Sequence, residues 1–222
     1  MNAINHSITA LVIKKYSPST PLLPILISVQ LIEVLWVVLN IIGVEHTDFE
    51  PTVSSLADVH LEFAPYSHSI AFTILWAALA WWVVAAIFKK PAWGPAIAIG
   101  VMSHIVLDII THSPDVEIIP FLGWPEIGSG LYGIPVYALV LELAYAVLCW
   151  WLVKGSGLLL AGILVLNLFG VTFYLPQIQG LETLLASYPY FFAPVIGVHI
   201  LLGWGAIYYL GKREQTLQPV TP

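Results

Sequence analysis

Four ionisable side chains stand in SHIVLDIITHSPD, residues 103–115, a stretch that is otherwise largely apolar. His104, Asp108 and His112 are spaced four residues apart, which places them on one side of a helix. An imidazole and a carboxylate one turn apart can reach the same metal ion, as the two histidines of an H-E-x-x-H helix do. Imidazole and carboxylate without thiolate suit Zn²⁺, Mn²⁺ or Fe²⁺. We therefore expect a divalent metal ion here, with zinc as the first choice.

Other ionisable residues lie at membrane depth in neighbouring apolar segments. A charged side chain at the bilayer centre costs about 2.5–3.5 kcal/mol on insertion scales, so it should face the bundle interior and find a partner. Glu33 and Glu142 lie near the middle of two such segments, and His68 lies at the outer end of a third. Their compatible depths lead us to expect that Glu33, His68 and Glu142 form a metal or catalytic site with His104 and Asp108. Glu142, or Asp115 at the mouth of the site, is the candidate general base.

Purely structural roles are the alternative interpretation of these residues. A buried His–Asp pair can simply join two helices through a hydrogen bond. His112 suits a metal ligand or a loop residue in water, and Asp115 follows a proline and suits a turn. His199 and Asn167 are typical of hydrogen bonds between membrane helices. His46 and His60 stand in a polar loop and are weak candidates.

The elements that must position these residues are membrane-spanning helices. The chain has 222 residues, of which 59% are hydrophobic and 9% charged, against about 25% charged in soluble domains. Its one cysteine excludes a disulfide framework and a multi-thiolate metal site. Six segments approach the ~20 residues that cross a bilayer as a helix. They are 22–44, 66–88, 93–111, 131–153, 156–175 and 189–211.

The spans imply an all-α membrane bundle, a single domain over 1–211, and a polar tail over 212–222 for which we expect disorder. All seven basic residues then fall on one side of the membrane: Lys14, Lys15, Lys89, Lys90, Lys154, Lys212 and Arg213. The positive-inside rule makes that side cytoplasmic, with both termini inside. The net charge of −6 describes an acidic outer face, and without a basic patch in the sequence we expect no nucleic acid partner. Membrane lipids and other membrane proteins are the partners to consider.

Two motifs carry a family resemblance. PYSHS at 65–69 and SHIVLDIITHSPD at 103–115 resemble a bacterial family described as membrane-bound metal-dependent hydrolases, with T/S-H-S opening one helix and S-H-x-x-x-D in the next. NHSITALVIKKYSPSTPL at 5–22, QLIEVLW at 30–36 and GLYGIPVYALVLELA at 130–144 are similar to its opening segment, first span and fourth span. The likeness covers about residues 5–150.

The resemblance implies a hydrolase in the bacterial inner membrane and a metal shell formed by His6, Glu33, His68, His104 and Asp108. Position 33 is Glu where the family suggests Asp. For His6 to reach the site, a short helix over about 3–13 must start within the bundle and descend to Lys14. The alternative is an amphipathic helix lying on the cytoplasmic surface.

Two functions remain open. One is a metal-dependent hydrolase whose site opens to the outer face and acts on a lipid-like ester or phosphoester, with the metal lowering the pKa of its bound water. The other is a non-catalytic subunit of a membrane complex, or a small transporter, whose buried His and Glu side chains bind an ion, haem or a pigment. His104 and His199 are the candidate axial ligands of such a group.

Overall fold

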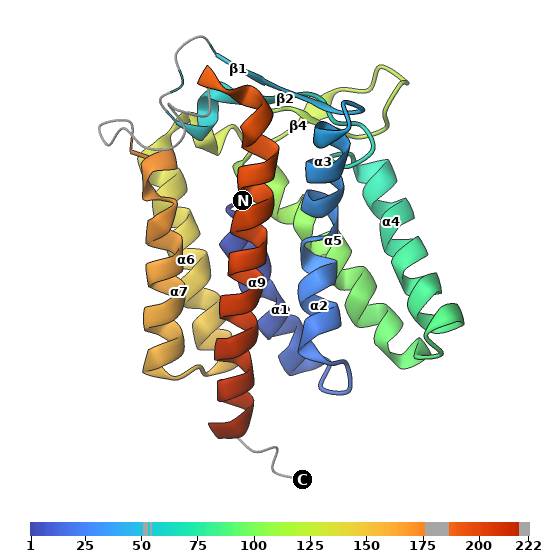
Figure 1. The fold of residues 1–222 in the computed structure, drawn as a ribbon, viewed down its shortest axis with the longest axis vertical. Helices are drawn as coiled ribbons and strands as arrows, with labels where there is room; N and C mark the ends of the chain where they lie inside the picture. Colours follow the sequence, from blue (N-terminus) through green and yellow to red (C-terminus); the bar gives the residue numbers. More distant parts are fainter. Residues whose placement is uncertain (51–52, 54, 176–186, 218–222) are drawn as a thin grey trace.

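The computed structural model describes residues 1–50, 53, 55–175 and 187–217 as a helical bundle with short strands at one end (Figure 1). The helices are α1 (Ala3–Tyr16), α2 (Leu22–Val29), α3 (Leu31–Ile41), α4 (Ile70–Trp82) with its π-helical continuation η2 (Val83–Ile87), α5 (Gly94–Thr111), α6 (Pro135–Val153), α7 (Gly157–Phe169) and α9 (Phe192–Leu217). Single 3₁₀ turns are η1 (Leu56–Asp58), η3 (Pro91–Trp93), η4 (Leu131–Gly133), η5 (Val171–Phe173) and η6 (Pro189–Phe191). The strands are β1 (His46–Phe49), β2 (Val59–Phe63), β3 (Val116–Glu117) and β4 (Glu126–Ile127).

The predicted all-α membrane bundle is confirmed. Within the described residues, four helical segments are long and apolar enough to cross a membrane: Ile70–Ile87, Pro91–Thr111, Pro135–Val153 and Pro189–Glu214. α2 and α3 meet the same length and composition test only as a pair, with a bend of 52° at the break between them. α7 occupies the remaining predicted span, but at 13 residues it is shorter than the ~20 that a bilayer requires.

The outward faces of these helices are apolar. Large exposed side chains include Ile74, Leu75, Trp82, Val140, Leu148, Val165, Leu201 and Leu202. Monomeric soluble proteins rarely expose contiguous apolar patches of this kind. A hydrocarbon environment around the bundle explains them, because lipid tails are as apolar as the side chains that they contact.

α1 lies inside the bundle, where it packs against α2, α5, α6 and α9. Its polar and apolar residues are buried alike, from Ile4 and His6 near its start to Ile13 near its end. The side chain of Asn2 caps the helix by accepting a hydrogen bond from the Ile4 amide at 2.9 Å. The prediction of a helix that begins within the bundle is therefore confirmed, and the surface helix is wrong.

The basic residues stand at or just after the ends of α1, η2, α6 and α9. These helix ends lie opposite the strands, at the end of the bundle where the C-terminus emerges (Figure 1). This segregation is the one expected from the positive-inside rule. α9 continues as a helix to Leu217 rather than ending near 211. Glu214 explains the extension, because its carboxylate accepts hydrogen bonds from the Ser156 amide at 3.0 Å and hydroxyl at 2.5 Å. Residues 218–222 of the expected tail lie outside the described residues.

The break between α2 and α3 faces α5. Gly100 of α5 sits against α2, and a Cβ added there would lie 2.0 Å from Ser28 Oγ. This close approach brings the end of α2, at Val29, beside the middle of α5. At the outer end, β1 pairs antiparallel with β2 and β3 with β4, and the connections that carry these strands cover the bundle.

Candidate metal centre

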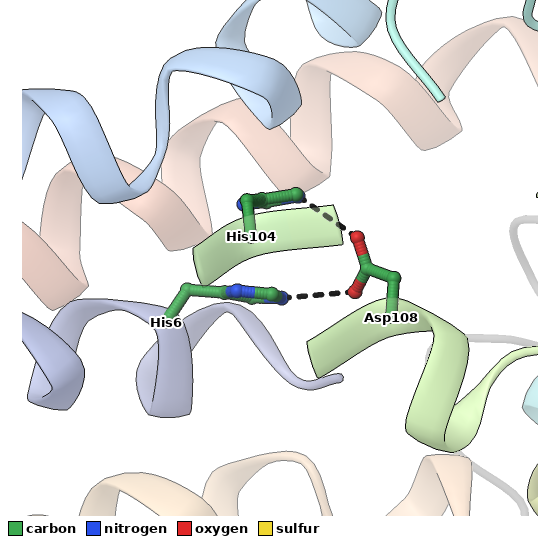
Figure 2. Close-up of side chains that lie close together, drawn as sticks. All are labelled: His6, His104 and Asp108. Carbon is green, nitrogen blue, oxygen red and sulfur yellow. Dashed lines mark hydrogen bonds and ion pairs between the residues drawn. The ribbon is translucent and has the colours of Figure 1, made fainter. Parts of the chain in front are cut away.

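α5 supplies the pair that the sequence singled out. His104 and Asp108 are both buried, and His104 Nε2 lies 3.1 Å from Asp108 Oδ2 (Figure 2). Their spacing of one helical turn puts both side chains on the same face of α5. The predicted His–Asp arrangement is thus present in the geometry.

A backbone carbonyl sets the tautomer of His104. Its Nδ1 lies 2.9 Å from the carbonyl oxygen of Val29, which can only accept a hydrogen bond. Val29 is the last residue of α2, and carbonyls at a helix end lack an intrahelical partner. His104 therefore donates through Nδ1–H. In the neutral ring this leaves the lone pair of Nε2 pointing at Asp108.

Glu33 and His68 approach the same point from two other segments. Glu33 stands in the first turn of α3, directly after the break, and its Oε2 lies 3.3 Å from His104 Nε2. His68 precedes α4, and its Nε2 lies 3.6 Å from Glu33 Oε2 and 3.9 Å from Asp108 Oδ2. Both predicted ligands thus lie beside the pair on α5.

His6 reaches the site from α1 and stacks on His104, with ring centroids 3.9 Å apart and planes at 15° (Figure 2). Its Nε2 lies 3.1 Å from Asp108 Oδ1 and 2.9 Å from the Met1 carbonyl. The Met1 amino group lies 2.6 Å from the same Asp108 oxygen. These contacts satisfy Oδ1 and leave Oδ2 directed at His104.

The residues present fit a divalent metal ion. Ligand atoms of His6, His104 and Asp108 lie within 4.8 Å of one another, as do those of Glu33, His68 and His104. His104 Nε2 and Asp108 Oδ2 are buried and have no hydrogen-bond partner. Burying such acceptors together is unfavourable unless a cation or proton donor joins them. A metal ion bound by nitrogen and oxygen would do so.

His112 and Asp115 form a rim beside these ligands. His112 follows the last residue of α5, with its Nε2 3.8 Å from Asp108 Oδ1 and its Nδ1 3.6 Å from Asp115 Oδ1. The His112 ring also lies near those of His68 and Tyr132, at centroid distances of 6.1 and 5.2 Å. The rim is nearer to water than His68, His104 and Asp108, since the His112 side chain is 20% exposed and those three are at most 2% exposed.

Glu142 is occupied by hydrogen bonds at the start of α1. Its carboxylate accepts from the Asn2 amide at 2.8 Å, from the Tyr174 hydroxyl at 3.0 Å and from the Asn5 side-chain amide. Asn167, on α7, donates to Asn5 Oδ1 at 3.4 Å. The predicted Glu142 and Asn167 therefore meet in a buried network that anchors the helix carrying His6.

A cavity of about 310 Å³ opens beside the ligands. Glu33, His68, His112 and Asp115 line its polar part, together with Tyr132, Tyr174 and His199. An apolar wall is formed by Trp36, Leu56, Val59, Leu61, Phe192, Val195 and Ile196. His60 lies elsewhere, 3.5 Å from Glu50 in an exposed pair, and His46 lies on exposed β1.

Sequence reasoning missed Glu45, Ser67 and Tyr174. Glu45 reads as one acid in a polar loop, yet its side chain is buried and bonded to Ser67. Ser67 flanks His68 in the PYSHS segment, but a serine hydroxyl near a helix start usually bonds to nearby backbone and so indicates no role. No spacing in the sequence brings Glu45 or Tyr174 to the site. Their positions depend on how the outer connections fold back.

Comparison with known proteins places the chain in a family. The sequence model described as YdjM inner membrane protein matches residues 60–179, more than half of the chain. This range contains His68, His104 and Asp108, whereas His6 and Glu33 lie before it. Neither the curated proteins nor the solved structures gave a match. The chain belongs to the YdjM inner membrane protein family and is a multi-pass protein of the inner membrane.

Proposed function

We propose that the protein is a membrane-embedded, metal-dependent hydrolase that acts on a lipid-like ester or phosphoester. The observation that carries the proposal is the convergence of two imidazole nitrogens and two carboxylate oxygens beside the cavity. These are His68 Nε2, His104 Nε2, Glu33 Oε2 and Asp108 Oδ2, joined by distances of 3.1–3.9 Å. Zinc suits this donor set, and manganese or iron are the alternatives.

The proposal assigns a role to each residue of the metal centre and its rim. His68, His104, Glu33 and Asp108 hold the metal, and His6 orients Asp108 through its contact with Oδ1. When bound, the ion supplies a water of lowered pKa and polarises the scissile group. Asp115 and His112 stand at the rim of the cavity, where their side chains could serve as general base and general acid. Glu142 secures the start of α1, since its oxygens already accept hydrogen bonds.

The cavity favours an amphiphilic substrate. Its apolar wall comes from α3, α9 and β2 and suits an acyl or other hydrocarbon part. No lysine or arginine is among the described residues that line it, and all seven basic residues lie at the opposite end of the bundle. A highly charged anion such as a polyphosphate would therefore meet no neutralising side chain. An ester or a singly charged phosphoester suits the cavity better.

Metal analysis of purified protein tests the proposal. We expect about one zinc, manganese or iron ion per wild-type chain and matched loss of that metal in His104→Ala and Asp108→Ala. His60→Ala is the control, because His60 lies outside the site and should keep the metal. Hydrolysis of ester and phosphoester lipids by the wild type should cease with a chelator and return with the metal. Wild-type protein that carries no metal after purification in zinc-containing buffer would overturn the proposal.

A further inference from the structure

A relay of hydrogen bonds runs from the Glu45 carboxylate through the Ser67 hydroxyl to His68 Nδ1. The Ser67 hydroxyl donates to Glu45 Oε2 at 2.6 Å, and Ser67 Oγ lies 2.9 Å from His68 Nδ1. Glu45, Ser67 and His68 are 1%, 0% and 2% exposed, so water does not compete for these bonds. These hydrogen bonds lie before α4, which begins at Ile70, so they do not belong to the hydrogen bonds that form that helix.

The order of donors follows from the carboxylate. Glu45 accepts the amide hydrogens of Tyr66 and Ser67 on Oε1, at 2.9 and 2.8 Å, and the Ser67 hydroxyl on Oε2. A serine hydroxyl has one hydrogen, and here it is given to Glu45. Ser67 Oγ can therefore only accept from His68, so that His68 Nδ1 carries a hydrogen. In the neutral ring the lone pair is then on Nε2, the nitrogen that faces Glu33 and Asp108.

We propose that Glu45 and Ser67 are positioning residues that fix His68 in the tautomer able to bind the metal. This inference rests on the proposed metal centre and names the device that prepares one of its ligands. Val29 does the same for His104 through a backbone carbonyl. Histidine ligands commonly donate their other ring N–H to a carboxylate or carbonyl, and losing such a partner lowers metal affinity by about 10–100-fold.

The backbone of the segment that carries Ser67 and His68 is held in place by its own hydrogen bonds. The His68 amide donates to the Ala64 carbonyl at 2.9 Å and Ser69 Oγ donates to the Pro65 carbonyl at 2.6 Å. The Trp76 indole N–H donates to the Tyr66 carbonyl at 2.8 Å. A substitution of the Glu45 carboxylate should therefore change the direction of the hydrogen bonds with little movement of the backbone.

Glu45→Gln should reverse the direction of the hydrogen bonds from Glu45 through Ser67 to His68 while the three side chains keep their positions. The amide oxygen must take the place of Oε1, because two backbone N–H groups donate there. The amide nitrogen then faces Ser67 Oγ and donates to it. Ser67 turns its hydroxyl hydrogen toward His68 Nδ1, which must become an acceptor. His68 then carries its hydrogen on Nε2, and that nitrogen can no longer bind a metal.

The experiment measures the tautomer and the metal separately. Nitrogen NMR of metal-free protein labelled in histidine, with His68→Gln to assign the signal, should show Nδ1–H in the wild type and Nε2–H in Glu45→Gln. Zinc titration against a competing chelator should show about 10–100-fold weaker binding in Glu45→Gln. Ser67→Ala should weaken binding similarly, Ser67→Thr should retain it, and Glu62→Gln, an exposed acid on β2, should behave as the wild type.

The possible results separate this inference from the proposed function. If Glu45→Gln keeps both the Nδ1–H tautomer and wild-type zinc affinity, the relay is overturned while the metal centre stands. If the wild type binds no zinc, the proposed function fails, and the tautomer measurement still decides the relay. Should Glu45→Gln fail to fold, the contrast between Ser67→Ala and Ser67→Thr decides, since equal zinc affinity in those two variants would also overturn it.

Discussion

Replacing Glu33 by Gln should remove the negative charge of this side chain while keeping its size and shape. Glu33 Oε2 faces the lone pairs of His104 Nε2 at 3.3 Å and His68 Nε2 at 3.6 Å. In Glu33→Gln an amide N–H can point at these nitrogens, so the variant needs no cation to satisfy them. A buried polar group without a partner costs about 1–3 kcal/mol. Since the Glu33 side chain is 20% exposed, we expect a gain near the lower value, about 1 kcal/mol, over metal-free wild type.

The bound metal should have a larger effect. A ligand present at 100 times its dissociation constant stabilises the folded state by about 2.7 kcal/mol. For a chain of this length each kcal/mol corresponds to about 2–4 °C in Tm. Thermal unfolding in detergent should therefore give a rise of about 5–11 °C when zinc is added to chelated wild type. Glu33→Gln should lie about 2–4 °C above the chelated wild type and should not respond to zinc.

The control for this experiment is Glu62→Gln, which removes an exposed carboxylate away from the site and should keep the full zinc response. A zinc-dependent rise in Glu33→Gln equal to that of the wild type would refute the role of Glu33 as a ligand. A Tm of Glu33→Gln well below that of chelated wild type would refute the claim that Glu33 Oε2, His68 Nε2 and His104 Nε2 meet as hydrogen-bond acceptors without a donor.

Two further predictions concern packing and pH. Gly100→Ala should destabilise the protein by about 1–3 kcal/mol and weaken zinc binding, because a Cβ there would lie 2.0 Å from Ser28 Oγ. Gly205→Ala is the control, because a Cβ there would have no neighbouring atom within 4 Å. Thermal unfolding and zinc titration should show neither effect in this control. Burial, and then the nearby charge of Glu126, raise the pKa of Glu117 above its usual value of 4.5. The folded state therefore holds this proton more tightly than the unfolded state, so stability falls as pH rises from 4.5 through the raised pKa. Glu117→Gln should flatten that fall in Tm measured against pH, and an unchanged slope would contradict it.

Much of the fold and part of the site could be predicted because the bilayer imposes strong rules. Apolar length gave the spans, and the position of the lysines gave the orientation. His104 and Asp108 stand out because two ionisable residues one turn apart in an apolar helix require partners. Glu33 and His68 followed from depth together with the family resemblance.

The rest depends on tertiary contacts that leave no pattern in the sequence. Nothing marks Glu45 as buried, since its position follows from the turn after α3 and not from a period. Glu142 was expected as a general base because a carboxylate at membrane depth suggests chemistry. The structure gives it three donors around the start of α1 instead. The role of Val29 is a backbone property, which no side-chain motif can report.

The central position of α1 also bears on how the protein is made. Chain synthesis delivers α1 before α9, yet α1 packs against α9 in the finished bundle. Ile4 and Leu11 lie so close to α9 that a Cβ at Gly203 or Gly211 would approach them within 3.0 and 2.7 Å. The surroundings of α1 are therefore complete only once α9 has also been inserted. Metal loading should follow membrane insertion as a late maturation step, and a nascent chain that lacks α9 should remain metal-free.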